Sequence, residues 1–303
     1  MTQRLEKVPR SWAEQEKLVN TKVVGENIDK MACGPVNTRD SKEAWSAIFV
    51  KPPFKSCLDT VIAIKPNCLG QQQHTHTKLC HVLTDILGAD PCNIHIYYAH
   101  HGMRMGSTPF QGLPKGVNLA VYWDGITANT SVPPPWQGKQ SNCLGPLVFG
   151  TVDILINISM CKGHSPLFGN FTMAMKKHFG TFSPGPGHGR GESGLDYLLA
   201  INQTPEILGK INAKTGNVLY PRQHLCLVDA LWAGESGPWL GPSHQTNFLA
   251  MGVFSPVVDY LVATQFRGQQ MGWPPNMDAT RRMLSAFGCS KNDLPYGGQI
   301  FQL

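Results

Sequence analysis

Short apolar runs alternate along this chain with stretches whose apolar residues recur at helical spacing. Runs rich in β-branched residues predict buried strands at 60–64, 93–98, 117–122, 152–158, 224–229 and 248–254. Helical spacing and helix-ending residues predict helices at 11–30, 41–49, 77–87, 194–201, 204–211, 255–268 and 277–287. This alternation predicts an α/β fold with a mainly parallel sheet and helices on both faces.

Glycine and proline, 31 and 23 of the 303 residues, predict ordered loops at the carboxyl ends of the strands. We divide the chain into a helical or irregular N-terminal extension, residues 1–55, an α/β domain, residues 56–270, and a C-terminal helix and tail, residues 271–303, packed on the same domain.

The stretch 152–180 is the centre of the predicted site. Its buried strand ends in a turn that carries Cys161, Lys162 and His164. The segment 170–179 then reads as a helix that Gly180 closes. A thiol, an ammonium and an imidazole within four residues, directly after a strand, indicate chemistry, because ligands bind at the carboxyl ends of strands in open α/β sheets.

Four predicted strands end in polar residues. These ends are Lys65-Pro66-Asn67, Asp124, the turn 161–164 and Asp229. In a parallel sheet such ends gather at one edge, which predicts a single polar cleft. The cleft is expected to be built from Lys65, Asn67, His164, Lys176 and Asp229.

Each site residue has a chemical and a structural interpretation. His164 would act as general acid and base, or would bond a backbone carbonyl. Lys162 or Lys176 would bind or neutralise an anion, with Thr172 one helical turn before Lys176. Lys176 would alternatively act as a base if desolvation lowered its pKa, although a solvated helix face also explains this lysine. Asp229 would orient a partner, or would cap a helix or a turn.

Two loops supply further candidates for substrate binding. Lys65 and Asn67 could fix a carboxylate or a phosphate, while Asn67 could equally satisfy the backbone of a turn. The glycine-rich loop 183–194 carries His188 and Arg190, and would either cradle an anion with backbone N–H groups or form a mobile lid. It matches neither the Rossmann fingerprint nor the P-loop, so no nucleotide is implied.

The ordered motifs over residues 60–268 resemble those of the domain of unknown function 362 family. They are Ala63-Ile64-Lys65-Pro66-Asn67, Asp153-Ile154-Leu155-Ile156-Asn157, Lys162-Gly163-His164, Lys176, Phe179-Gly180, Asp229, Gly234-Glu235-Ser236-Gly237-Pro238 and Ser255-Pro256-Val257-Val258-Asp259. The resemblance implies an α/β protein; many members carry a ferredoxin module and many look exported. This chain lacks the ferredoxin cysteines and has Ser255 where an aspartate is expected. Before Phe179-Gly180 it has Lys176-Lys177-His178, where the family commonly has Lys-Asn.

Charge and apolar content limit the classes of partner and compartment. The net charge of +6 is modest and no run of Lys and Arg occurs, so nucleic acid is not expected as a partner. The longest apolar candidate, 247–263, contains Pro256 and Asp259, so no membrane span is expected. We expect a soluble protein, and the sequence leaves open a cytoplasmic or an exported location and the oligomeric state.

The leading interpretation is an enzyme that acts on a small carboxylate- or phosphate-bearing molecule by acid–base chemistry of the isomerase, racemase or lyase type, without a required cofactor. The first alternative is a metal- or redox-cofactor protein, an oxidoreductase or electron-transfer partner, with Cys161, His164, Glu235 and nearby histidines as ligands. The nine cysteines form no Cys-x-x-Cys pair, so no ferredoxin-type cluster motif is present. The second alternative is an anion-binding module without catalysis.

Overall fold

The computed structural model describes residues 3–4, 14–15, 17–67, 74–99, 110–120, 127–134, 136, 139–188, 192–211, 214, 218–237 and 242–294. Among the residues of interest, Arg190 and Asp124 lie outside these ranges.

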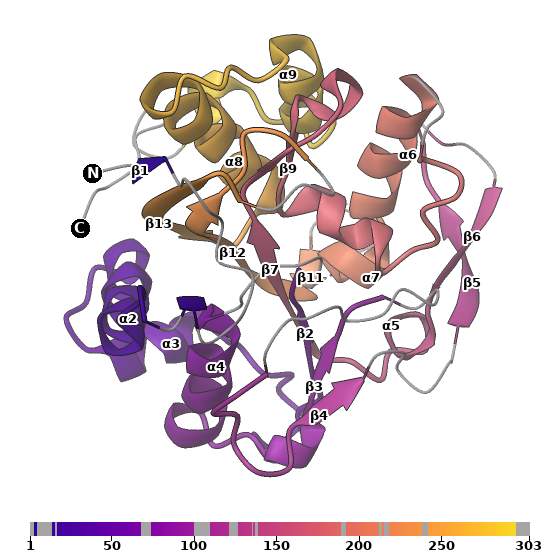
Figure 1. Ribbon diagram of the computed structural model, residues 1–303. Helices are drawn as coiled ribbons and strands as arrows, with labels where there is room; N and C mark the ends of the chain where they lie inside the picture. Colours follow the sequence, from indigo (N-terminus) through magenta and orange to yellow (C-terminus); the bar gives the residue numbers. More distant parts are fainter. Residues whose placement is uncertain are drawn as a thin grey trace.

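A seven-stranded sheet forms the centre of the fold (Figure 1). Its order is β1 (Gln3–Arg4), β13 (His244–Gly252), β12 (Gln223–Ala233), β7 (Ile154–Met160), β2 (Ile62–Lys65), β3 (Ile94–Tyr97) and β4 (Asn118–Ala120). The strands from β12 to β4 are parallel, whereas β13 pairs antiparallel with β12 and β1 pairs antiparallel with β13. The predicted α/β fold with a mainly parallel sheet is confirmed.

Both faces of the sheet are covered, which explains why the central strands carry apolar residues on both of their faces. All seven residues of β7 are buried. Because side chains alternate along a strand, Ile154 and Ile156 join one hydrophobic core and Leu155 joins the other. A strand that was solvated on one face would alternate apolar and polar residues instead.

One layer of helices contains α2 (Thr21–Val36), α3 (Ser41–Ile48) and α4 (His74–His81), and α4 continues as the π-helix η1 (Val82–Ile86). These indigo and purple helices cover one face of the sheet (Figure 1). Asn20 caps the start of α2 and Asp40 caps the start of α3 with their side chains. Trp45 is fully buried in the core beneath them.

The other face is covered by segments from the second half of the chain, coloured from magenta to yellow (Figure 1). They are α5 (Gly145–Val148), the 3₁₀ helices η3 (Pro166–Phe168) and η4 (Met175–Phe179), α6 (Glu192–Asn202), α7 (Pro205–Leu208), α8 (Ser255–Leu261) with its π-helical continuation η5 (Val262–Gln270), and α9 (Met277–Ser285). Short 3₁₀ turns η2 (Pro91–Asn93) and η6 (Lys291–Asp293) complete the helical elements.

Three small antiparallel pairs lie outside the main sheet: β5 (Thr127–Val132) with β6 (Lys139–Leu144), β8 (Lys162–Gly163) with β9 (Phe171–Thr172), and β10 (Lys210–Ile211) with β11 (Val218–Tyr220). The sequence pattern predicted none of them. The predicted helix at 170–179 is therefore wrong over its first half, because Phe171 and Thr172 pair with the turn after β7. The predicted helix at 204–211 ends early, at Leu208, because Gly209 has a φ of 98°.

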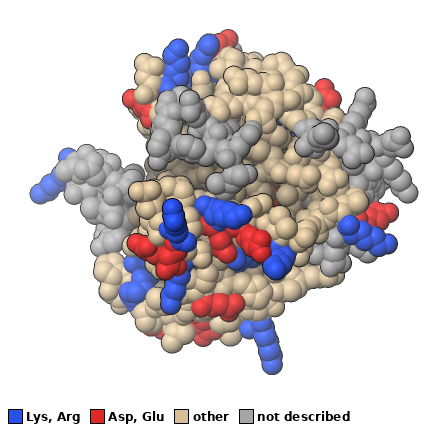
Figure 2. Space-filling model, turned by 90° about the vertical axis from the view of Figure 1, so that its left-hand side faces the viewer, with Lys and Arg blue, Asp and Glu red and all other residues tan. Residues whose placement is uncertain are grey.

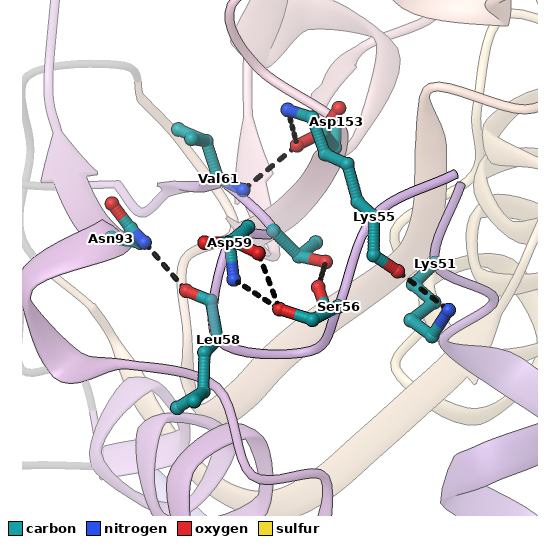
Figure 3. Close-up of polar contacts among 9 residues, drawn as sticks. Lys51, Lys55, Ser56, Leu58, Asp59, Val61, Asn93 and Asp153 are labelled. Carbon is teal, nitrogen blue, oxygen red and sulfur yellow. Dashed lines mark hydrogen bonds and ion pairs between the residues drawn. The ribbon is translucent and has the colours of Figure 1, made fainter. Parts of the chain in front are cut away.

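Where the neighbouring strands β2 and β7 begin, a buried carboxylate connects the two segments (Figure 3). Asp153 accepts hydrogen bonds from Nζ of Lys55, at 2.6 Å, and from the backbone N–H of Val61, at 2.9 Å. Lys51 donates to the carbonyl of Lys55 nearby. Asp153 thus fixes the start of β7 beside the start of β2, and its place in the family-like motif has a structural reason.

The face that carries α2 and α3 has acidic and basic side chains intermixed (Figure 2). Its charges include the ion pairs Lys22–Glu26 and Lys78–Asp29. No helix in the described part of the chain is long and apolar enough to cross a membrane.

Candidate functional site

The turn after β7 is locked to the loop after β12 by backbone contacts. Gly163 N–H donates to the carbonyl of Gly234, and Gly234 N–H donates to that of Cys161, both at 3.0 Å. A Cβ atom on Gly163 would lie 2.1 Å from the carbonyl oxygen of Glu235. Glycine is therefore required at 163 by close approach of two main chains.

Arg267, in η5, supports this junction and was not among the residues that the sequence singled out. It is 2% exposed, and its guanidinium donates to the carbonyls of Gly234 at 2.9 Å and Glu235 at 3.2 Å. It also contacts the thiol of Cys161 at 3.7 Å and stacks over Trp273. Arg267 lies one helical turn after the buried Ala263 and directly after the buried Phe266. A charged residue on an otherwise apolar helix face is the sequence signal that could have identified it.

The hairpin of β8 and β9 positions two predicted site residues. Lys162 lies directly opposite Thr172, and both are buried. The hydroxyl of Thr172 has no hydrogen-bond partner among the described residues. The expectation that Thr172 and Lys176 share a helix face is wrong, because Thr172 is in a strand and the 3₁₀ helix begins only at Met175.

Asp259, at the end of the Ser255–Asp259 motif, fixes the start of η4. Its carboxylate accepts the backbone N–H groups of Ala174 at 2.8 Å and Met175 at 2.9 Å. Burial raises the pKa of Asp259 to about 7, although these two bonds act in the opposite direction. Ser255 does not cap its helix through its side chain; its hydroxyl accepts a hydrogen bond from the side chain of Gln223, at 3.4 Å.

His164, Lys176 and His188 come together around two aromatic rings. Nζ of Lys176 lies 3.4 Å from Nε2 of His188, and 4.9 and 5.0 Å from the ring centres of Phe168 and Phe179. The rings of His164 and His188 are stacked with centres 6.5 Å apart. Three predicted residues from separate segments, the turn after β7, η4 and the loop that begins at 183, thus form one cluster, the Lys176 cluster.

Burial in this cluster favours the neutral forms of its bases. It lowers the pKa of Lys176 to about 7. It lowers the pKa of His164 to about 3, with the charges of Lys176 and His188 acting in the same direction, and lowers that of His188. Near neutral pH, both imidazoles are therefore uncharged and Lys176 is the group that titrates. His164 Nδ1 is buried without a hydrogen-bond partner among the described residues.

Lys65 belongs to a second group of polar side chains, which is buried on the same side of the sheet as the Lys176 cluster. Strand alternation places it beside the 3₁₀ helix η4, with its Nζ 4.9 Å from the ring centre of Tyr98. Gly180 closes η4 as predicted, although with a φ of −95°. A Cβ atom there would lie 2.7 Å from the Tyr98 carbonyl and 2.8 Å from Lys65 Nζ, so close packing rather than left-handed geometry requires glycine.

His178 is the centre of this deeper group. Its ring bonds the side chains of Gln223 at 2.8 Å and Thr181 at 3.2 Å, and Thr181 bonds Tyr97 at 2.8 Å. Burial lowers the pKa of His178 to about 3, with Lys65 and Lys177 acting in the same direction. Lys177 is also buried, with 7% of its surface exposed.

Asp229 lies away from the Lys176 cluster. It sits within β12 rather than at its end, and alternation places it with Leu227 and Leu231 on the face that α4 covers. Its carboxylate accepts a hydrogen bond from the hydroxyl of Thr75 at 3.3 Å, and a bond from the backbone N–H of Thr75 also acts on its pKa. Burial raises this pKa to about 6. The structure favours the capping interpretation of Asp229 at the start of α4.

The remaining predicted residues are not brought into the cluster. Asn67 is buried after β2. Cys161 faces Arg267, and burial raises its thiol pKa. No three His, Cys, Asp or Glu side chains in the described ranges come together to hold a metal ion, so Cys161, His164 and Glu235 do not form a ligand set. Arg190 lies outside the described residues.

Two hollows of the described surface lie elsewhere. One, of about 560 Å³, is lined by residues of α2 and the start of α3, and one, of about 330 Å³, lies between α3, η1 and β2. Neither contains a predicted site residue.

No family model matches the chain, and neither a curated protein nor a solved structure matches it. The candidate site is therefore defined by its own geometry.

Proposed function

We propose that this protein is an enzyme that acts on a small carboxylate- or phosphate-bearing molecule by acid–base chemistry at the Lys176 cluster. The observation that carries the proposal is the position of Lys176 beside His188, in a half-buried aromatic setting that lowers the pKa of Lys176 to about 7. A general acid and base works best when its pKa is near the working pH.

The geometry favours a different distribution of roles from the one expected from sequence. Lys176 would transfer the proton, because it populates both protonation states at pH 7. His164 and His188 would remain neutral and would accept or relay hydrogen bonds. Asp229 would serve the fold through Thr75.

Positive charge around the strand ends supports an anionic substrate. Lys65 is buried beside η4, Lys177 is buried within η4, and Lys162 is buried in the β8–β9 hairpin. Arg267 is buried against the turn after β7. The buried carboxylate of Asp259 is engaged by two backbone N–H groups. Among the described residues, these cationic side chains would attract an anion that approaches Lys176. Carboxylate and phosphate groups are the common anions of this size.

We also propose membership of the domain of unknown function 362 family. Several of its motifs pack against one another in this chain: Gly163 against Glu235, Gly180 against Lys65, and Asp259 against η4. These contacts give a physical reason for the motifs to occur together, and the proposal rests on that order of motifs.

The first test is ligand-dependent thermal stability. Inorganic phosphate, oxalate and malonate should raise the Tm of the wild-type protein and of Lys22→Met, a variant that removes an exposed lysine on α2. Lys176→Met should lose that increase while keeping its unliganded Tm within a few degrees. Equal Tm shifts in wild type and Lys176→Met, or no shift with any of the three anions, would contradict an anion site at Lys176.

The second test separates an enzyme from an anion-binding module. Lactate, malate and alanine each carry an exchangeable hydrogen beside a carboxylate, and loss of that proton signal in D₂O would report proton abstraction. We expect exchange with wild type and Lys22→Met and none with Lys176→Met. Anion binding without exchange of any of these hydrogens would favour the module.

A further inference from the structure

The amine of Lys176 has an environment unlike that of the paired lysines in this protein. Lys55 and Lys78 hold carboxylates at 2.6 and 2.7 Å, and Figure 3 shows the first of these pairs. Lys176 forms no ion pair with any carboxylate in the described structure, and the faces of Phe168 and Phe179 lie beside its Nζ.

Proton acceptors stand next to this amine. Nε2 of His188 is 3.4 Å from Nζ of Lys176, and His164 is stacked on His188. Both imidazoles are neutral because burial and the neighbouring charges lower their pKa values. With a pKa lowered to about 7, Lys176 holds a large share of free amine at neutral pH, which is the nucleophilic form.

We propose that Lys176 forms an imine with the carbonyl carbon of a small 2-oxo acid. The proposal rests on the function proposed above and names its substrate class. An anionic carbonyl compound suits both features of the cluster, because its carboxylate is attracted by the cationic side chains and its carbonyl carbon is attacked by the amine.

The bond changes balance without another reactant. Nζ of Lys176 attacks the carbonyl carbon, and one proton passes from nitrogen through His188 to the carbonyl oxygen, giving a carbinolamine. Loss of the hydroxyl with the second nitrogen-bound proton gives the C=N bond and one molecule of water. The imine nitrogen then takes up one proton from water, and the protonated imine draws electrons from the neighbouring carbon, which makes its hydrogen acidic and fits the proposed proton transfer.

Reductive trapping tests the proposal on the intact wild-type protein. Pyruvate or glyoxylate with sodium cyanoborohydride at pH 7 should leave a stable secondary amine at Lys176, located by peptide mass spectrometry. Each unit by which a lysine pKa falls raises its free-amine fraction about tenfold at this pH. We expect labelling of Lys176 at least about tenfold faster than of the neighbouring Lys177 or of exposed Lys22. Labelling of Lys176 no faster than of Lys22 would overturn the proposal.

Lys176→Arg distinguishes this inference from the function on which it rests. Arginine keeps the positive charge but forms no imine, so the variant should keep its Tm increase with phosphate and lose the trapped adduct. If phosphate stabilises wild type but not Lys176→Met, and wild type forms no adduct, the imine proposal is contradicted and the anion site at Lys176 is supported. Absence of phosphate stabilisation would instead contradict the proposed function itself.

Discussion

Nζ of Lys176 lies 3.4 Å from Nε2 of His188, and the pKa of each is lowered by burial. The pairing joins the 3₁₀ helix η4 to the loop that begins at 183. It also means that this lysine faces two imidazoles, those of His164 and His188, rather than a carboxylate in the described structure.

The contribution of Lys176 to stability should depend on pH. Its pKa is about 7 in the folded protein, whereas an unperturbed lysine, as in the unfolded chain, has a pKa of 10.5. Between these values the unfolded chain holds more protons, so wild-type stability relative to Lys176→Met should rise with pH. The slope cannot exceed about 1.4 kcal/mol per pH unit, because a single proton is involved, and partial solvation of the side chain would narrow the pH range over which it applies. Urea unfolding from pH 6 to 10 checks this, and a stability difference that is constant over that range would contradict it.

Asp259→Asn should disturb both the fold and the Lys176 cluster. The carboxylate accepts two backbone N–H groups at the start of η4, whereas the amide can accept with only one of its two polar atoms. An unsatisfied buried donor costs about 1–3 kcal/mol, so we expect a loss of that size in the free energy of unfolding. Slower trapping at Lys176 would accompany it. A variant with wild-type stability would show that Asp259 does not hold η4.

Gly163→Ala should be strongly destabilising, because its Cβ atom would lie 2.1 Å from the Glu235 carbonyl oxygen. Overpacking of this kind typically costs about 1–3 kcal/mol. The matched control is Gly25→Ala in α2, where the added Cβ would make only ordinary contact with the Lys78 side chain, 3.5 Å away. Alanine should stabilise that helix by about 0.5–1 kcal/mol. Equal effects of the two substitutions in chemical denaturation would contradict the close approach.

Asp229→Asn should affect stability and leave anion binding intact. The side chain bonds Thr75 at the start of α4, on the face of the sheet away from η4. Loss of part of this cap should lower the free energy of unfolding by about 1 kcal/mol. The Tm increase with phosphate should match that of wild type. Loss of the phosphate effect in this variant would restore Asp229 to the site.

The sequence predicts the main sheet well because its strands carry a strong local signal. β7 and β12 are rich in apolar residues and buried along their whole length, and the helices beside them have helical periodicity and clear stops, such as Gly88 and Gly288 with φ of 71°. The short pairs escaped prediction for a physical reason. Phe171 and Thr172 form a strand only because the turn at 162–163 lies beside them, which no local pattern encodes.

The site was predicted in part, for a similar reason. Residues that directly follow strands, such as His164, could be found from position alone. The sequence pattern predicts that the strand ends at Asp229, whereas β12 continues to Ala233. With the longer strand, the alternation of side chains would have placed Asp229 on the face away from η4. The lowered pKa of Lys176 depends on Phe168, Phe179 and His188, which only the folded chain brings together.

The pKa of Lys176, measured with and without an anion, tests the central claim most directly. A heteronuclear NMR titration of the lysine side chains, with Lys176 assigned by its absence in Lys176→Arg, would give both values. We predict a midpoint near 7 in the free protein and a higher one with saturating malonate or phosphate, because a bound anion favours the ammonium form. A midpoint near 10.5 that neither anion changes would contradict the account.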